Sequence, residues 1–368
     1  MQALILAGGQ ATRLRPLTSH VPKLVVPLVG RPFIGYMLEW LRGHGVDDVV
    51  MSCGFLADGV RAVLGDGSAY GVRLRYVEEP QPLGTGGALK FAEDLLAERF
   101  FMLNGDGLTD IDLSAQLAQH ERTGARVTLG LIPVDDPSAY GLVRCHPDTA
   151  VAEFLEKPGP EQVVDTNLVS AGIYVIEREV LATMAPAGSV ISIERDVFPA
   201  LVGHGLHGYC ASGYWLDIGT PDRYLRATFD IMEGNVRTAV GDQLAAAAMR
   251  LVDGAQVGGR LVGPVVLDEG CEVAAGARVG GGVVLGRNVR IESGARVERS
   301  VLLDGVTVGR RTRISGAIIS AGAQIGDNCH IDDGAMVGAG VSLGAENTLS
   351  AGVRIFPGVS LPDGAIRF

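Results

Sequence analysis

The sequence predicts an α/β domain with a mostly parallel sheet, followed by a second domain built from short repeated strands. Three observations support this prediction. Apolar runs alternate with helical patterns up to about residue 234, apolar residues recur every six positions from about residue 256, and glycine occurs 52 times in 368 residues. Alternating strands and helices form parallel sheets, whereas a short fixed period forms a solenoid. Because the chain is 47% hydrophobic, its glycines indicate regular tight turns rather than disorder.

The first half contains six expected strands and three clear helical stretches. The strands are Ala3–Leu6, Val49–Ser52, Leu74–Val77, Phe100–Leu103, Val127–Leu131 and Gly172–Ile176. The helices are Phe33–Arg42, Ala88–Glu98 and Leu113–Arg122. Continuous apolar strands of this kind are typical of a Rossmann-like sheet that is covered on both faces. Ligands of such sheets bind at the carboxyl ends of the strands.

The second half is organised in hexads. The in-phase apolar residues are Val273, Val279, Leu285, Ile291 and Val297, and after a slip Ile325, Ile331, Val337, Leu343, Leu349, Ile355 and Leu361. A chance period in a segment rich in valine and glycine is the alternative, and seven consecutive matches disfavour it. The pattern resembles the left-handed parallel β-helix of hexapeptide-repeat proteins, with three hexads per coil and about six coils.

The change of pattern divides the chain into three parts. We expect a first domain over residues 1–234, a linker with a packing helix over residues 235–255, and a β-helix over residues 256–368. The helix is suggested by the run Leu244–Met249, which is rich in alanine. Since the open ends and flat faces of a β-helix favour contacts between copies, we also expect a homo-oligomer.

Composition excludes several classes of function. The formal net charge of −11 argues against nonspecific nucleic-acid binding. The five cysteines are scattered and form no Cys-x-x-Cys motif, which fits a reducing cytoplasm and no thiol-based metal site. No apolar segment approaches the length that spans a membrane, and the N-terminus reads as a first strand rather than a signal peptide. We therefore expect a cytoplasmic protein without nucleic-acid or membrane partners.

The strongest local signal is a glycine turn with nearby cations. Residues 6–18 read LAGGQATRLRPLT, and Pro22-Lys23 follows. Gly8 and Gly9 let backbone amides approach an anion, and Arg13 and Lys23 add positive charge. A tight strand–helix turn with surface basic residues is the alternative. The two glycines together with Arg13, Arg15 and Lys23 favour a phosphate site. The turn is not a Walker motif, because no Gly-Lys-Ser/Thr follows the glycines.

Two carboxylates occur where a metal ion could bind. Asp106 follows the apolar strand Phe100–Leu103, so it lies at a carboxyl strand end. Asp217 lies between Leu216 and Ile218, and a carboxylate in an apolar segment needs a partner. Either residue alone could be a helix cap or a turn residue. Together with the glycine turn, they favour a divalent cation.

Five motifs in the same order resemble the nucleoside-diphosphate-sugar pyrophosphorylases. They span most of the first domain and are the glycine turn, Pro82–Ala88 (PLGTGGA), Leu103–Asp106 (LNGD), Phe154–Pro158 (FLEKP) and Tyr214–Pro221 (YWLDIGTP). Several branches of this family also carry a hexad domain. The PLGTGGA loop and the stretch Ile193–Pro199 look most like the mannose-1-phosphate guanylyltransferases and related heptose enzymes.

The resemblance implies transfer of a nucleoside monophosphate from a triphosphate, with GTP favoured, to a sugar-1-phosphate, with release of pyrophosphate. It assigns catalysis to Arg13, Lys23, Asp106, Lys157 and Asp217, with Asp106 and Asp217 holding Mg²⁺. It assigns nucleotide binding to Leu6, Ala7, Gly8, Gly9, Gln81, Leu83, Gly84 and Thr85. It assigns acceptor binding to Gly141, Glu156, Lys157, Ser170 and Ala171. From spacing alone, Glu156-Lys157 would read as a solvated pair.

Three positions depart from the family pattern. Ala11 stands where glycine is usual. If the loop needs a positive φ there, alanine costs about 1 kcal/mol, and otherwise the position tolerates the Cβ, which is the outcome we expect. Gly107 replaces a larger aliphatic residue after Asp106. Ser170 replaces asparagine at a position that faces the sugar in relatives, so a heptose phosphate or a cyclitol phosphate of the valienol type is an alternative acceptor.

Two other classes of function remain as alternatives. An acyltransferase that uses the β-helix would need a catalytic histidine, and His330 is the one histidine in the hexads. A non-catalytic homologue that binds nucleotide sugars would not need Lys23, Asp106 and Asp217, all of which are present. No histidine is assigned to catalysis.

Overall fold

The computed structural model describes residues 1–9, 11–54, 56–138, 140–157, 166–252, 254–350 and 352–367. The chain divides into two compact units. The first contains Met1–Gln10 and Ile34–Trp215, and the second contains Ala11–Phe33 and Leu216–Phe368. The segment that follows the first strand therefore packs with the C-terminal part of the chain. Among the described residues, no helix combines the length and the apolarity needed to cross a membrane.

Four parallel strands form one half of the sheet in the first unit. Their order is β6-β1-β4-β5, and the bounds are β1 Gln2–Ala7, β4 Asp48–Cys53, β5 Arg73–Glu78 and β6 Arg99–Asn104. Each contains one predicted strand, extended by one or two residues. Leu4, Val50, Phe100 and Met102 are fully buried, as the continuous apolar pattern predicts for strands covered on both faces.

Antiparallel strands extend this sheet beyond β6. The long strand β11 (Leu168–Glu177) runs antiparallel to β6 and to β8 (Val127–Pro133). The remaining strands are β9 Gly141–Cys145, β10 Val151–Glu156 and β12 Leu206–Cys210. Among the described strands of this half, β12 alone pairs in parallel, with β8. The predicted α/β sheet with its parallel core is confirmed, and the antiparallel strands carry the motifs from Gly141 to Ala171.

The helices of the first unit agree with the predicted pattern at two of three places. Their bounds are α1 Phe33–Gly43, α2 Ala57–Leu64, α3 Gly84–Phe91, α4 Leu113–Thr123 and α5 Phe198–Leu201. The helix predicted at Ala88–Glu98 was placed too late, because α3 already begins at Gly84. Its first turn is held from outside, since the amides of Gly86 and Gly87 both donate to the carbonyl of Ile191.

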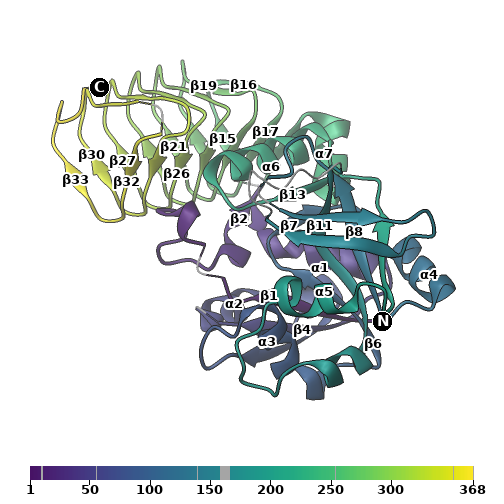
Figure 1. Cartoon of the computed structure of the whole chain (residues 1–368). Helices are drawn as coiled ribbons and strands as arrows, with labels where there is room; N and C mark the ends of the chain where they lie inside the picture. The colour runs from purple at the N-terminus through teal and green to yellow at the C-terminus, as the bar shows by residue number, and fades with distance from the viewer. Residues whose placement is uncertain are drawn as a thin grey trace. The chain divides into compact units, whose positions relative to one another are not determined.

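Three parallel sheets form the C-terminal part of the second unit, as the green-to-yellow coils of Figure 1 show. Sheet one contains β14 Met249–Leu251, β17 Val265–Leu267, β20 Val283–Leu285, β23 Val301–Leu302, β26 Ile318–Ile319, β29 Met336–Val337 and β32 Arg354–Ile355. Sheet two contains β15 Gln256–Val257, β18 Glu272–Val273, β21 Arg290–Ile291, β24 Thr307–Val308, β27 Gln324–Ile325, β30 Ser342–Leu343 and β33 Ser360–Leu361. Sheet three contains β16 Arg260–Val262, β19 Arg278–Gly280, β22 Arg296–Glu298, β25 Arg313–Ser315, β28 His330–Ile331 and β31 Thr348–Leu349.

This arrangement is consistent with the predicted left-handed β-helix. The predicted hexad residues line its interior, and all of them except Leu361 on the last strand are buried. The slip in the hexad series also has a structural explanation. Val283 pairs with Val265, which is three full hexads earlier in the chain. Val301 pairs with Val284, and Ile318 pairs with Val301, so these two coils are each one residue short of three hexads.

Helices and a short hairpin complete the second unit. They are α6 Pro221–Glu233, α7 Ala239–Ala247 and the paired strands β2 Pro27–Leu28 and β3 Arg31–Pro32. The hydroxyl of Thr220 accepts from the amide of Arg223, which confirms the predicted N-cap of α6. The helix predicted around Leu244–Met249 lies earlier, as α7, because Met249 already begins β14 and pairs with Val265. That strand precedes residue 256, where we expected the β-helix to begin.

Sheet one is buried on its outer face as well as on its inner face. The outward side chains form a column along the coils: Val266, Val284, Val301, Ile318, Met336 and Arg354. The five apolar members are at most 2% exposed. Arg354 ends the column, and its guanidinium group donates to the carbonyls of Arg13 and Arg15 at 3.1 Å. The glycine-turn segment therefore contacts the β-helix through backbone groups.

Interior hexad residues should dominate the stability of the β-helix. We predict that Ile291→Ala, which empties a buried position, lowers the free energy of unfolding by about 2–5 kcal/mol. The control is Leu361→Ala on the last strand. Because this side chain is partly exposed, its removal should lower the free energy of unfolding by less than half as much. Chemical denaturation measures both losses, and equal losses would contradict the interior assignment.

Candidate active site

The carboxyl ends of three parallel strands bring glycines and Asp106 to one edge of the first unit. Leu6 on β1 pairs with Ser52 on β4 and with Asn104 on β6. The loops that follow are tightly packed, since a Cβ on Gly54 would lie 3.3 Å from the Cα of Gly8. The amide of Gly105 donates to the carbonyl of Leu6 at 3.0 Å. Asp106 follows, half-buried, in the turn between β6 and β7 (Gly107–Thr109).

Glu79, which was not among the predicted site residues, connects this edge to the predicted nucleotide-binding loop Gln81–Gly87, which we call the base-binding loop. One carboxylate oxygen accepts from the hydroxyl of Ser52 at 2.9 Å, and the other accepts from the amide of Leu83 at 3.2 Å. A Cβ on Gly8 would lie 3.5 Å from the first oxygen. A carboxylate at the end of a strand, directly before a predicted loop, is the signal that could have identified it.

The glycines of the predicted base-binding loop have a packing role. A Cβ on Gly84 would lie 2.5 Å from the carbonyl oxygen of Ile191, and one on Gly87 would lie 2.5 Å from that of Ser189. Both backbone polar groups of Leu83 are used within the protein, since its carbonyl accepts from the amide of Ile191. The segment around Ile191 thus fixes the loop, whereas Gln81 is exposed.

Thr85 is also bonded inside the protein. Its hydroxyl donates to Glu194 at 2.6 Å and accepts from the amide of Ile193 at 2.9 Å. Ser192 donates to the same carboxylate oxygen of Glu194 at 2.9 Å. This network explains why the stretch Ile193–Pro199 accompanies the loop motif, because the two segments support each other. The predicted contact of Thr85 with nucleotide therefore competes with an internal network.

The predicted acceptor residues gather on the antiparallel strands. Glu156 is the last residue of β10, and Lys157 then takes a left-handed backbone conformation with φ of 49°. This turn brings the ammonium group of Lys157 to 3.5 Å from the carboxylate of Glu156. A Cβ on Gly141 would lie 2.7 Å from the other carboxylate oxygen of Glu156. Gly141 therefore leaves room for this carboxylate.

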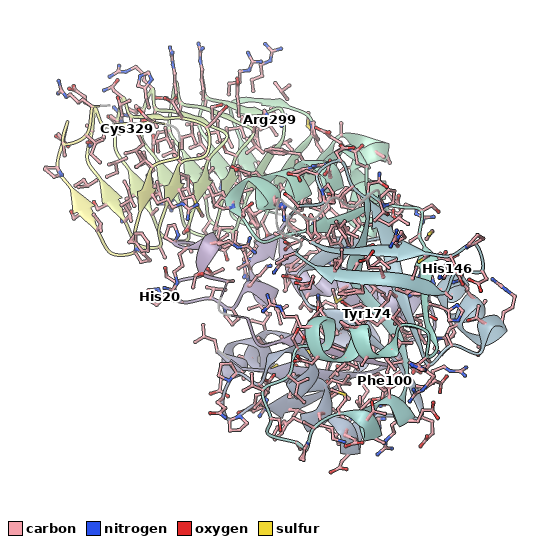
Figure 2. The ribbon with its side chains drawn as sticks, viewed as in Figure 1. His20, Phe100, His146, Tyr174, Arg299 and Cys329 are labelled. Carbon is pink, nitrogen blue, oxygen red and sulfur yellow. The ribbon has the colours of Figure 1, made fainter. Side chains whose placement is uncertain are left out.

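Ser170 and Ala171 both have partners on aromatic residues. The hydroxyl groups of Ser170 and Tyr174 lie 3.1 Å apart, and burial raises the pKa of Tyr174 well above its usual value. The indole of Trp215 donates to the carbonyl of Ala171 at 2.8 Å, and its ring meets Tyr140 edge to face. Figure 2 labels Tyr174 within the first unit. The serine hydroxyl is thus already held by a neutral phenol.

The second unit brings together the predicted cations and Asp217. One carboxylate oxygen of Asp217 lies 3.7 Å from the ammonium group of Lys23, and the other accepts from Arg223 at 2.9 Å. A Cβ on Gly219 would lie 3.0 Å from both the guanidinium group of Arg13 and the carboxylate of Asp217. Arg13, Lys23 and Asp217 therefore form one cluster. Arg223 was not predicted, although its place shortly after Thr220, in the first turn of α6, was visible in the sequence.

The donor set of the two carboxylates suits a hard divalent cation, because such ions prefer carboxylate oxygens. Among the described residues, no group of three or more His, Cys, Asp or Glu side chains could hold a metal. Asp106 lies in the first unit and Asp217 in the second.

The structure decides between the two alternatives for Ala11 in favour of the positive φ. Its backbone is left-handed, with φ of 46° and ψ of 42°, so the position requires the conformation that glycine adopts most easily. Its carbonyl accepts from the amide of Leu14 at 3.1 Å and from the hydroxyl of Thr18 at 2.8 Å. These bonds hold the turn in a conformation that is strained for alanine.

Restoring glycine at this position should relieve the strain. A left-handed alanine costs about 1–2 kcal/mol, and the added freedom of the unfolded chain returns about 0.4–1 kcal/mol. We predict that Ala11→Gly raises the free energy of unfolding by about 0.5–1 kcal/mol. The control Ala118→Gly, at an exposed position inside α4, should lower it by about 1 kcal/mol. A loss of stability in both variants would refute the strain at Ala11.

Comparison with known proteins identifies the family. Residues 2–234 match the family described as Nucleotidyl transferase, and residues 261–363 match the GMPPB C-terminal domain. The chain is 37% identical to a mannose-1-phosphate guanylyltransferase of Mycobacterium tuberculosis, over 100% of this chain and 98% of that protein. It is 32% identical to mannose-1-phosphate guanylyltransferase 1 of Arabidopsis thaliana, over 90% of each chain.

A solved structure supports the same assignment for the first part of the chain. HddC from Yersinia pseudotuberculosis, crystallised in complex with GMP-PN, is 27% identical, with a TM-score of 0.53. The match covers 62% of this chain and 98% of HddC. The five sequence motifs, the parallel α/β core and these similarities agree, and the chain is a nucleotidyltransferase that belongs to the Nucleotidyl transferase family.

Proposed function

We propose that the protein transfers GMP from GTP to mannose-1-phosphate, forming GDP-mannose and releasing pyrophosphate. The observation that carries this proposal is the similarity to the M. tuberculosis mannose-1-phosphate guanylyltransferase over the whole chain. The cluster of Arg13, Lys23 and Asp217 supports it, because it concentrates charged groups suited to phosphates and a metal at the glycine turn. The family uses a divalent metal, and we propose that it is Mg²⁺.

The proposed reaction is an in-line attack by an acceptor phosphate oxygen on the α-phosphorus of the triphosphate. Two anions must meet, so their repulsion is the main obstacle. Mg²⁺ bound by Asp106 and Asp217 would neutralise and align phosphate oxygens. Lys157 holds the acceptor phosphate, while Arg13 and the glycine-turn amides stabilise the negative charge that grows on pyrophosphate. No general base is needed, because the acceptor phosphate is already ionised at neutral pH.

The partners of Asp217 suit this mechanism. Lys23 and Arg223 balance its charge in the structure, so the carboxylate is oriented before a metal and nucleotide arrive. When phosphates bind, Lys23 can turn from the carboxylate to a phosphate oxygen without leaving the cluster. Glu156 is placed to bind acceptor hydroxyls beside Lys157, in the space that Gly141 leaves.

The acceptor has one alternative that a specific observation supports. Ser170 stands where asparagine is usual in the family that the sequence resembles. A heptose phosphate or a valienol-type cyclitol phosphate is therefore the second candidate acceptor. The contact between Ser170 and Tyr174 favours mannose-1-phosphate, because it gives the serine hydroxyl a partner without any ligand. A water molecule could then occupy the space of the longer side chain.

We also propose a homo-oligomer that acts in the cytoplasm. The last strand β33 leaves an open end of the β-helix where Leu361 is partly exposed, which is suited to contact with another copy. An acyltransferase remains a weaker alternative, because its candidate residue His330 lies exposed on β28. A non-catalytic role is disfavoured by the retention of Lys23, Asp106 and Asp217.

The metal assignment is tested by removing charge from each carboxylate. We predict that Asp106→Asn and Asp217→Asn each lower kcat by about 10²- to 10³-fold, the loss expected for one preorganised electrostatic contact. The control is Asp94→Asn, because Asp94 is exposed. Asp110 is not used, since its carboxylate accepts a hydrogen bond from the amide of Tyr214. Pyrophosphate release at saturating Mg²⁺ measures the rates, and near-normal turnover in both variants would refute the assignment.

Substrate choice is tested by a panel of pyrophosphate-release assays. We predict that GTP is preferred to UTP, dTTP and ATP, and that mannose-1-phosphate gives the highest kcat/KM among mannose, glucose, heptose and cyclitol phosphates. Ser170→Asn should change kcat/KM for mannose-1-phosphate by less than about 10-fold. A heptose or cyclitol phosphate that reacts faster, with mannose-1-phosphate rescued by Ser170→Asn, would transfer the proposal to that acceptor.

Arg354 is predicted to be a positioning residue for the glycine turn. Arg354→Ala removes two bonds to the backbone that carries Arg13, so KM for GTP should rise by about 3- to 10-fold while unfolding changes little. Arg354→Lys, which keeps one donor, should recover part of the loss. The control Arg290→Ala, on sheet two, should leave KM unchanged. An equal effect of both alanine variants would contradict a specific role.

A further inference from the structure

Sheet three of the β-helix carries a row of arginines. Arg260, Arg278, Arg296 and Arg313 pair in register on β16, β19, β22 and β25, and His330 follows on β28. Each arginine comes directly before an inward residue of the hydrophobic core, so the four side chains point outward. All four are exposed. We refer to these four residues as the arginine row.

The geometry of the row is set by the sheet. Adjacent strands lie about 4.8 Å apart, so the first and last α-carbons are separated by about 14 Å. Nitrogen-tipped side chains project outward from the β-helix in Figure 2, along the edge where Figure 1 labels β16 and β19. One positive charge per coil therefore follows a straight line along the surface.

Such a row is unfavourable unless something balances it. Like charges directly opposite each other on adjacent strands destabilise a sheet. In the part of the chain that the structure describes, none of the four arginines forms an ion pair with a carboxylate, whereas Arg287 pairs with Asp304 and Arg290 with Glu272. One carboxylate, Glu298, stands two residues after Arg296 on the same strand and is also exposed, yet the described residues show no ion pair between it and the row. The row is thus suited to an external anion.

A groove runs beside the row. It has a volume of about 460 Å³ and is lined by Arg260, Arg278 and Arg296 together with the corner residues Gly258, Gly259 and Gly276. The glycines are required by close packing, since a Cβ on Gly259 would lie 2.7 Å from the carbonyl oxygen of Ala277. Three of the four arginines therefore border a shallow, open groove along which an extended anion can lie.

We propose that the arginine row binds an oligophosphate, an anion with three or more linked phosphates. Guanidinium groups match phosphate oxygens in a two-point fork, and evenly spaced forks suit a linear chain of charges better than one compact anion. A long polyanion such as a nucleic acid is disfavoured, because four coils offer a short contact and the chain as a whole is negative. None of the residues in the row belongs to the predicted catalytic set.

The experiment titrates inorganic tripolyphosphate into the full-length protein by calorimetry at low salt. The test variant is Arg278→Gln/Arg296→Gln, and the matched control is Arg287→Gln/Arg290→Gln, which removes two charges from the same domain. Because the proposed catalytic site can also take a triphosphate, the row is measured as the additional site: wild type and control should show it alike, and in the test variant it should bind at least about 10-fold more weakly. Binding should also weaken steeply as the NaCl concentration rises from about 50 to about 200 mM. Turnover at saturating substrates should be the same in all three proteins.

Further ligands identify the source of the phosphates. If the row binds GTP as tightly as tripolyphosphate, the natural ligand is the triphosphate group of a nucleotide. If the row binds tripolyphosphate and not GTP, the natural ligand is an inorganic phosphate chain. Either result supports the row, provided that it is lost in the test variant. Inorganic phosphate that binds as tightly as tripolyphosphate would overturn the proposal, as would equal binding in the test variant and the control. The unfolding midpoint gives a second readout, because tripolyphosphate should raise it in wild type and not in the test variant.

Discussion

The attachment of the glycine-turn segment to the β-helix unit is the constraint on which the candidate site depends. The chain leaves the first unit after β1, and residues from Ala11 to Phe33 pack within the second unit. Leu14, Leu17, Leu24 and Val25 are buried there, and Arg354 holds the backbone of Arg13 and Arg15. The glycines of the turn thus belong to one unit and its cations to the other.

The charges at the turn follow from this attachment. Lys23 and Asp217 are both largely buried, and two such groups are stable away from water only when they are paired. Arg223 completes the pairing from the first turn of α6, and the hydroxyl of Tyr224 in the same turn donates to the carbonyl of Pro27. The helix that Thr220 begins therefore positions both the carboxylate and the segment that carries the cations. The second unit therefore holds these charged groups together through its own contacts.

Periodic features were predicted from the sequence, and pairings between distant segments were not. The hexads predicted the β-helix because inward residues repeat along the chain, and the slip between Val297 and Ile325 marks two shorter coils. Strand ends were predicted from apolar runs. By contrast, the bond between Thr85 and Glu194 joins residues 109 positions apart, and no local pattern indicates it.

Three features became clear only from the structure. The glycines of the base-binding loop have a packing role, because their lack of a Cβ is required by the backbone at Ser189 and Ile191. The left-handed backbone of Ala11, one of the two alternatives, depends on bonds to Leu14 and Thr18 that become visible only in three dimensions. The arginine row escaped notice because its members are separated by a full coil of the chain and align only when the coils are in register.

The central claim is that the bond between the α- and β-phosphates of a triphosphate breaks as an acceptor phosphate attacks. Parallel reactions with GTP labelled with ³²P at the α- or the γ-phosphate, each with mannose-1-phosphate and Mg²⁺, test this directly. The account predicts that the α-label appears in the sugar nucleotide and the γ-label in pyrophosphate. Transfer of the γ-label to the sugar, or release of the γ-label as inorganic phosphate without a sugar nucleotide, would contradict it.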